Sequence, residues 1–170
     1  MKISVLSASQ ISIQKPLTDD WMREPIFYNQ RYVQAQEPDY RPFISPMTAR
    51  RMGKLLKRAL ATSLKAVNDA QITELDAVVT GTGLGCIANT EHFLSAMTNN
   101  GEQFLQPTFF MQSTHNTISS QVALQLQCHG YNNTYSHLGI SFESALYDVL
   151  LQFYADKLTH ALVGGHDEMT

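Results

Sequence analysis

The sequence predicts an α/β domain in which helices pack on a mixed sheet. Short apolar runs of strand length alternate along the chain with segments whose apolar residues recur at helical spacing. The composition, 44% hydrophobic and 16% charged, is typical of a folded globular chain. A length of 170 residues is enough for one hydrophobic core, so we expect a single domain over residues 1–170.

The N-terminal third predicts one strand, an irregular segment and a long helix. Residues 2–7 alternate apolar and polar side chains, which indicates a strand and not a signal peptide. Residues 15–46 are rich in proline and aromatics without a clear period, so we expect an ordered excursion over the surface. Ser45 and Pro46 then provide an N-cap and a first helical residue, and apolar spacing continues the helix to Ala70.

The middle of the chain predicts one buried strand and two helices. The run "LDAVVTGTGLG", residues 75–85, is apolar at first and then glycine-rich, as in a buried strand that opens into a loop. A short helix is expected to begin at Asn89 as N-cap and to stop at Gly101. Residues 113–130 begin with capping side chains, acquire helical periodicity and are expected to end at Gly130.

The segment "NNTYSHLGISFESAL", residues 132–146, predicts a strand, a tight turn at Gly139 and a helix. This succession is the geometry of a nucleophile elbow. A last apolar strand is expected within residues 159–168, "THALVGGHDE". The helix after the turn has one apolar face, formed by Phe142, Ala145, Leu146, Val149, Leu150 and Phe153.

The net charge of −3 gives no reason to expect nucleic acid or an acidic membrane as a partner, because both select for strong positive charge. Basic residues cluster locally at Arg50, Arg51, Lys54, Lys57 and Arg58. This cluster is either the solvated face of a helix or a patch for an acidic carrier or a phosphate.

The cysteine and histidine spacing predicts no metal site. Cys86 and Cys128 form no CxxC pair, which favours a reducing compartment. No two of the six histidines stand four residues apart on one helix with a carboxylate partner, as a metal site would need. No apolar run approaches the roughly 18 residues that a membrane helix needs. We expect a cytoplasmic protein without a metal.

The run "TGTGLG" resembles a dinucleotide fingerprint but has the wrong spacing. The third glycine of GxGxxG would fall on Cys86. We interpret the glycines as a tight turn with close backbone packing and expect no cofactor.

Ser141 lies in a G-x-S sequence, the start of the hydrolase elbow G-x-S-x-G. Glu143 stands where that motif needs its closing glycine. Ser141 is then either a nucleophile with His137 as its base or an N-cap of the following helix. Both interpretations remain open from the sequence.

Several motifs in order resemble the N-terminal half of the β-ketoacyl synthases. They are "FISPMTARRMGKLLKRALATSLKA", "TGTGLGC", "QPTFFMQSTHN", "HGYNNT", the elbow and "HALVGGHDE". The resemblance implies a thiolase-like layered αβα fold, in a family that condenses acyl and malonyl units held on acyl carrier protein. It covers nearly the whole chain.

The resemblance implies that Gly139 occupies the position of the family's catalytic cysteine. The same residue is reached by counting forward from Gly130 and backward from Gly164 and Gly165. A thiol at a helix N-terminus is stabilised as thiolate, whereas glycine has no nucleophile. The family's two catalytic histidines belong to its C-terminal half, and no histidine of this sequence matches them.

A ketosynthase relative without its nucleophile resembles a chain-length factor, the partner of an active ketosynthase in polyketide or aryl polyene synthesis. We therefore expect a non-catalytic subunit, acting in a homo- or heterodimer with a ketosynthase and with acyl carrier protein. The resemblance implies interface or acyl-tunnel positions at Asn116, Tyr131, Tyr135, Leu138 and Phe142. Two alternatives remain: the N-terminal part of a longer or split 3-oxoacyl-acyl carrier protein synthase, and a serine hydrolase or thioesterase.

Overall fold

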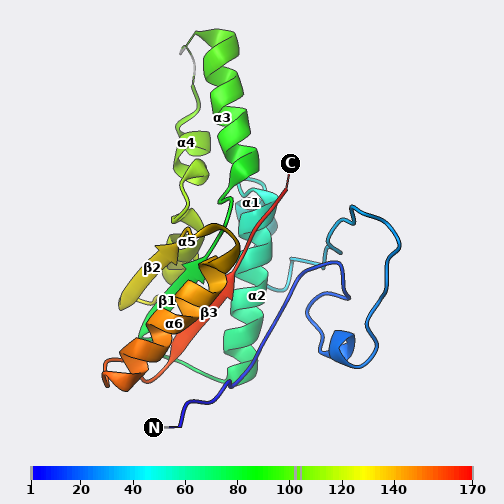
Figure 1. The fold of residues 1–170 in the computed structure, drawn as a ribbon. Helices are drawn as coiled ribbons and strands as arrows, with labels where there is room; N and C mark the ends of the chain where they lie inside the picture. The colour runs from blue at the N-terminus through cyan, green and yellow to red at the C-terminus, as the bar shows by residue number, and fades with distance from the viewer. Residues whose placement is uncertain (1, 102, 104, 170) are drawn as a thin grey trace.

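The computed structural model describes residues 2–101, 103 and 105–169 (Figure 1). Its centre is a sheet of β1 (Ala77–Gly81), β2 (Tyr131–Tyr135) and β3 (Ala161–Gly165) in the order β2-β1-β3. Both outer strands run parallel to β1, so the strands described here form a parallel sheet where a mixed one was expected. The prediction of a layered α/β domain is confirmed.

Helices cover both faces of the sheet (Figure 1). α6 (Ser141–Tyr154) lies on one face, and α2 (Lys54–Ala70) and α5 (Thr117–Gln125) lie on the other. β1 is buried along its whole length because it is the central strand. Its side chains alternate between two cores, one containing Ala77, Val79, Ala145 and Val149 and the other Leu60, Val78, Ile118 and Val122.

Two helices project from this layered body. α3 (Ile87–Asn100) and α4 (Pro107–Ser113) pack side by side and extend away from the sheet (Figure 1). α3 ends at Gly101, which has the left-handed conformation expected of a helix-stopping glycine. This arm, formed by α3 and α4, carries Leu94, Phe110 and Met111 as exposed apolar side chains.

The N-terminal strand expected at residues 2–7 is not formed. This segment is extended and has no ladder partner, and it is held instead by the Ser7 hydroxyl, which donates to the Ala66 carbonyl of α2 at 2.6 Å. Alternation of side chains predicts strand structure only when a neighbouring strand completes the ladder. The irregular excursion after it is confirmed, with a single 3-10 turn at Asp20–Met22.

The helix expected from Pro46 to Ala70 is interrupted. Ser45 accepts from the Thr48 N–H and caps α1 (Pro46–Ala49), as predicted. The chain then leaves helical conformation, and Gly53 is the N-cap of α2. A methyl group at Gly53 would approach the Asn89 amide nitrogen to 3.2 Å, so this break also makes room for α3.

Two other helix boundaries differ from the prediction. α3 begins at Ile87, so Asn89 lies in its first turn and is not its cap; its side chain donates to the Gln112 carbonyl. α5 ends at Gln125, before Gly130. Gly130 is required for a different reason, because a Cβ there would lie 2.0 Å from the Asp76 carbonyl oxygen.

Candidate functional site

Three loops meet at the carboxyl edge of the parallel sheet, where ligand sites of α/β folds usually lie. They are residues 82–86 after β1, residues 136–140 after β2 and residues 166–169 after β3. Thr82 N–H donates to the Tyr135 carbonyl at 2.9 Å, and His166 N–H donates to the Gly81 carbonyl at 3.1 Å. These two bonds extend the pairing of β1 with β2 and β3 by one residue, into the start of the loops after β1 and β3.

The glycines of "TGTGLG" allow the elbow to pack directly on the loop after β1. A Cβ at Gly81 would lie 2.3 Å from the backbone carbonyl of Ser141, and a Cβ at Gly83 would lie 3.1 Å from the Leu138 carbonyl oxygen. Gly85 has φ +64° and approaches the His115 ring. These contacts confirm the interpretation of the motif as a close backbone packing turn.

Two carboxylates after β3 accept hydrogen bonds from the loop after β1 and from the start of α3. Asp167 Oδ1 accepts from the Thr82 hydroxyl and from the N–H groups of Gly83 and Leu84, at 2.8–3.0 Å. Glu168 accepts from the Ala88 N–H at 3.1 Å, in the first turn of α3. A negative charge at that position also interacts favourably with the helix dipole. The acidic pair thus binds the loop after β1 and stabilises the base of the projecting arm.

Gly139 lies at the exposed top of the elbow, within a 3-10 turn, Leu138–Ile140, that leads into α6. A Cβ added there would meet no heavy atom within 4 Å, and its φ lies outside the left-handed range. Leu138, by contrast, has φ 55° and is 73% exposed. A bulky residue held in this conformation marks a strained turn, of the kind that gathers at functional sites.

The hydroxyl of Ser141 is buried and fully engaged. The residue is 3% exposed, and its Oγ lies within 2.9 Å of the Thr82 and Leu138 carbonyl oxygens and accepts from the His137 N–H. The His137 ring lies 3.0 Å from the Ser144 Oγ instead. The structure therefore brings the His137 backbone, and not its imidazole, to Ser141, which begins α6 directly after its N-cap, Ile140.

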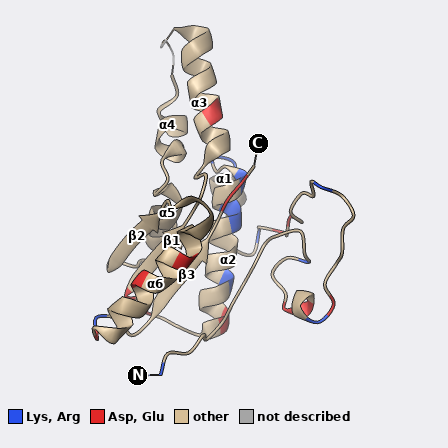
Figure 2. Cartoon of the chain, in the orientation of Figure 1, with Lys and Arg blue, Asp and Glu red and all other residues tan. Residues whose placement is uncertain are grey.

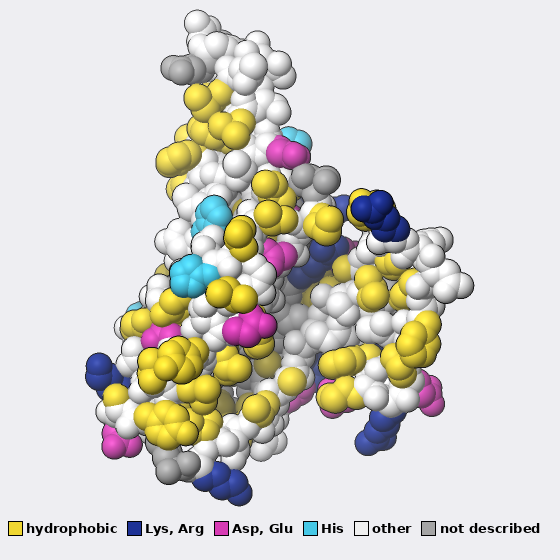
Figure 3. All heavy atoms as spheres, viewed as in Figure 1, with side chains coloured by type: hydrophobic (Ala, Val, Ile, Leu, Met, Phe, Trp, Pro, Cys, Tyr) yellow, Lys and Arg dark blue, Asp and Glu magenta, His cyan; other side chains and the backbone are white. Residues whose placement is uncertain are grey.

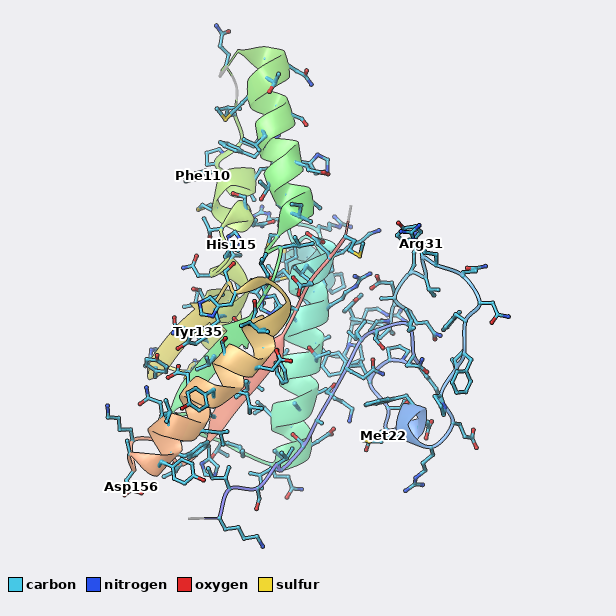
Figure 4. The ribbon with its side chains drawn as sticks, viewed as in Figure 1. Met22, Arg31, Phe110, His115, Tyr135 and Asp156 are labelled. Carbon is cyan, nitrogen blue, oxygen red and sulfur yellow. The ribbon has the colours of Figure 1, made fainter. Side chains whose placement is uncertain are left out.

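The two faces of β2 have different partners. Ser119, fully buried on α5, lies 2.7 Å from the Thr134 hydroxyl and 3.1 Å from the Asn132 side-chain oxygen. Tyr131 and Tyr135 alternate with these residues and therefore lie on the α6 side of the strand. Figure 4 labels Tyr135 and His115 near the elbow.

The remaining sequence-predicted positions are placed on the surface around the elbow. Asn116 is exposed and is the N-cap of α5. Phe142 is 44% exposed on the first turn of α6 and covers Gly165, whose Cβ would lie 3.2 Å from its ring. Only Ala145 and Val149 of the predicted apolar face are fully buried.

The outer side of α6 is an exposed apolar surface. Hydrophobic side chains gather over this helix in Figure 3. The α6 surface consists of Phe142, Leu146, Tyr147, Leu151 and Tyr154. An apolar surface of this kind marks a site of association.

Burial perturbs two further groups beside the elbow that the sequence did not single out. Burial lowers the pKa of His166 to about 4, although the Asp167 charge opposes this shift. Burial, together with the Glu168 charge, raises the pKa of the Cys86 thiol to about 11. Cys86 and His166 lie within the motifs "TGTGLGC" and "HALVGGHDE", at the ends of two predicted strands, but residue types and spacing do not indicate that these two groups are buried.

A hollow of about 890 Å³ lies at the other end of the sheet and is lined by Asp76, Gly130, Tyr131 and Leu158 among others. The side chain and N–H of Thr159 and the N–H of His160 lower the pKa of Asp76 to about 2.

No group of three or more metal-binding side chains occurs in the described residues. Nor does any helix among them have the length and apolarity needed to cross a membrane.

A parallel sheet between two helical layers, with a strained turn before α6, places the chain in the α/β class and agrees with the thiolase-like fold that the motifs implied. The family model described as beta-ketoacyl synthase, N-terminal domain, matches residues 19–169. The chain therefore belongs to the β-ketoacyl synthase family, as its motifs implied. No curated protein matches the chain.

Solved structures agree with this fold at low identity. A ketosynthase in complex with its chain length factor, from Xenorhabdus doucetiae, matches with 18% identity and a TM-score of 0.71, over 91% of this chain and 63% of its own. The ishigamide ketosynthase/chain length factor matches with 21% identity and a TM-score of 0.69, over 78% of this chain and 39% of its own.

A third structure, a β-ketoacyl synthase from Burkholderia phymatum STM815, matches with 18% identity and a TM-score of 0.63, over 98% of this chain and 41% of its own. The chain therefore spans less than two thirds of the length of each of these proteins. At these identities the likeness describes the fold.

Proposed function

We propose that the chain is a non-catalytic, chain-length-factor-like subunit that acts with an active ketosynthase in fatty acid, polyketide or aryl polyene-type synthesis. The observation that carries this proposal is Gly139 at the open top of the elbow. The turn, the glycine packing beneath it and the helix N-terminus are all present, but the residue in the nucleophile position has no side chain. Covalent acyl transfer to that position is chemically impossible.

Steric conflict does not account for the missing nucleophile. A Cβ at Gly139 has open space, and the backbone there suits any L-residue. A cysteine side chain would fit at this position, so neither packing nor backbone conformation requires a glycine there. The missing nucleophile is therefore a difference in chemistry and not in structure. The role left for the elbow is to shape a surface that a partner or an acyl group contacts.

Two exposed surfaces support a protein partner. β2 is an edge strand whose outer backbone groups pair with no strand in the described residues, and such edges readily add a strand from another chain. Tyr131 begins β2 and is 37% exposed, and Leu138, in the turn after β2, is 73% exposed. The α6 surface offers apolar contact beyond the elbow.

The basic cluster supports an acidic carrier as second partner. Arg50, Arg51 and Lys54 are exposed at the junction of α1 and α2, and Figure 2 shows positive residues along α2. Arg58 is occupied by an ion pair with Glu37. We infer that the three exposed residues contact acyl carrier protein, whose binding should weaken as salt is raised.

Co-expression tests the proposal. Each cysteine-containing ketosynthase of the native host is expressed with this chain, and the products are examined by size-exclusion chromatography with light scattering. We expect one of them to form a stable complex containing both chains. Separate species in every pairing would overturn the proposal.

The hydrolase alternative predicts an adduct that the proposed subunit should not form. A fluorophosphonate or a β-lactone is incubated with the chain and with Ser141→Ala, and adducts are located by mass spectrometry. Because the Ser141 hydroxyl is buried and hydrogen-bonded, we expect no modification of it. Labelling of Ser141 in the wild type would favour the hydrolase.

A second candidate function is the N-terminal part of a longer or split ketosynthase-like protein. The apolar α6 surface favours it, because a second α/β half would bury these side chains. Reading the gene beyond the codon for Thr170, and the neighbouring frames, for a ketosynthase C-terminal half distinguishes this candidate from a separate subunit.

A further inference from the structure

The irregular N-terminal excursion carries a hollow lined by apolar side chains. Two stretches of the excursion, residues 10–17 and 26–36, lie side by side, and neither contains a helix or a strand. The hollow that they line has a volume of about 390 Å³, within the range of roughly 300–1,000 Å³ that is usual for small-molecule sites. Its apolar lining is Ile13, Ile26, Phe27, Tyr28 and Val33. In Figure 4 the labels of Met22 and Arg31 mark this excursion, apart from the sheet.

Side-chain amides hold the two stretches together. The Gln14 amide bonds both backbone groups of Ile26, accepting from the N–H at 2.7 Å and donating to the carbonyl at 2.9 Å. The Gln36 amide donates to the Ile13 carbonyl at 3.1 Å and to the Tyr28 hydroxyl at 3.0 Å. Tyr28 in turn donates to the Ile13 carbonyl at 2.7 Å. The hollow is therefore preformed, and a ligand that enters it loses little affinity to the ordering of the chain.

The same hydrogen bonds make the walls of the hollow more apolar. Both backbone groups of Ile26 and the hydroxyl of Tyr28 are already bonded within the chain. Solvent nevertheless reaches the side chains, since Ile26 is 41% exposed and Phe27 is 87% exposed. Apolar surface gains free energy when it is removed from water, so these walls favour a ligand with an apolar part.

Arg31 adds one positive charge to the lining. Its guanidinium carbon lies over the Tyr32 ring, 5.4 Å from the ring centroid. A guanidinium held over an aromatic face keeps its N–H donors in its own plane, where they bind both oxygens of a carboxylate. Arg31 takes part in none of the four ion pairs found among the described residues. The hollow is thus complementary to an anion that carries an apolar chain.

We propose that this hollow binds a linear carboxylate with an apolar chain, of the class of the medium-chain fatty acids. The carboxylate binds Arg31 through charge-assisted hydrogen bonds, and the chain covers Ile26, Phe27 and Val33. One cation among apolar walls matches one anionic group on one apolar chain, and the volume limits the occupant to a single small molecule. The site uses residues of the excursion alone, so the inference goes beyond the proposed function and does not depend on it.

The fluorescence of Trp21, the one tryptophan of the sequence, reports binding because this residue is partly exposed on the same excursion. The chain is titrated with octanoate, decanoate and dodecanoate, each below its critical micelle concentration, and isothermal titration calorimetry gives the stoichiometry. We expect one saturable site whose affinity rises up to about fourfold for each added methylene that the hollow buries. Decanol, which has the same chain as decanoate without the charge, should bind about tenfold more weakly.

Two variants separate the charge from the apolar wall. Arg31→Gln should weaken decanoate binding about tenfold and leave decanol binding as it is. Phe27→Ala should weaken the binding of both ligands. Both side chains are exposed, so the melting temperature of the free chain should stay that of wild type. Arg23→Gln is the matched control, because Arg23 is exposed on the same excursion but does not line the hollow, and it should bind both ligands like wild type.

Absence of saturable binding to the wild-type chain would overturn the inference. Equal decanoate affinity of wild type and either Arg31→Gln or Phe27→Ala would do so as well, because the ligand would then bind elsewhere, as on the α6 surface. Light scattering examines a second copy of the chain as the occupant: a dimer that Phe27→Ala converts to a monomer, without fatty acid binding, would assign the hollow to an interface between copies. Complex formation with a ketosynthase is measured separately, so each of these results leaves the proposed function standing.

Discussion

Replacing Gly139 by cysteine tests whether the elbow still stabilises a thiolate. The new side chain has open space and an unstrained backbone, so the variant should fold like wild type. Ile140 is the N-cap of α6, so a thiol at position 139 lies one residue before the helix, at the positive end of its dipole. We expect the pKa of this thiol to fall below the ordinary value of about 8.5.

The size of the effect follows from the helix dipole. A helix N-terminus stabilises a nearby negative charge by about 0.3–1 kcal/mol, which lowers a thiol pKa by about 0.2–0.7. Glu143, in the same first turn, opposes this by like charge, so the shift should lie towards the smaller value. At pH 7 the thiolate fraction then rises from roughly 3% to roughly 5–10%.

Alkylation by iodoacetamide as a function of pH measures this pKa, with each site quantified by peptide mass spectrometry. Asn100→Cys is the matched control, because it is exposed at the last residue of α3, where the dipole has the opposite sign. We expect the native thiols to react slowly, because Cys86 is buried with its pKa raised to about 11 and the Cys128 thiol donates a hydrogen bond to the Leu75 carbonyl.

The order of the two pKa values decides the result. The thiol at position 139 should titrate below the thiol at position 100. An equal or higher pKa at position 139 would refute the reasoning, and the elbow would then retain only the backbone shape of a nucleophile site.

Three further predictions concern the packing beneath the site. Gly81→Ala should lower the free energy of unfolding by about 1–3 kcal/mol or more, because its methyl group meets fixed backbone at the start of α6. Ser119→Ala should cost about 1–3 kcal/mol in urea unfolding, because it leaves the polar partners on β2 short of a hydrogen bond. Asp76→Asn should flatten the acid dependence of the melting temperature. Since the folded pKa of Asp76, about 2, lies below the unfolded value of about 3.9, its stabilisation is complete above pH 4 and is lost as pH falls towards 2.

Each of these variants has a control within the chain. Gly164→Ala should be nearly neutral, because its added methyl reaches only the Thr80 methyl at 3.9 Å. Ser120→Ala removes a neighbouring hydroxyl that is not fully buried and should cost far less than the change at Ser119. Asp156→Asn should keep the acid profile of the wild type. Equal losses of unfolding free energy in Gly81→Ala and Gly164→Ala, or in Ser119→Ala and Ser120→Ala, would contradict the packing and bonding described above. An unchanged acid dependence of the melting temperature in Asp76→Asn would do the same.

The sequence by itself determined the order of the main elements and the elbow. Helical spacing, the Ser45 cap and the Gly101 stop are local signals, since capping and periodicity act within a few residues. The family motifs likewise depend only on residue types and their spacing, and they led to Gly139. The β-prone run before the glycine and the helical pattern after it are both present in the structure.

Only the tertiary structure decided which of the predicted helices and strands form and which side chains and backbone groups contact one another. Residues 2–7 have strand alternation but no ladder partner, and Gly130 is required by the Asp76 carbonyl, far away in sequence, and not by a helix end. The binding of Asp167 to the loop after β1 also depends on contacts across the fold. Such contacts join residues tens of positions apart, and no period or motif records them, because they arise only when the sheet brings its loops together.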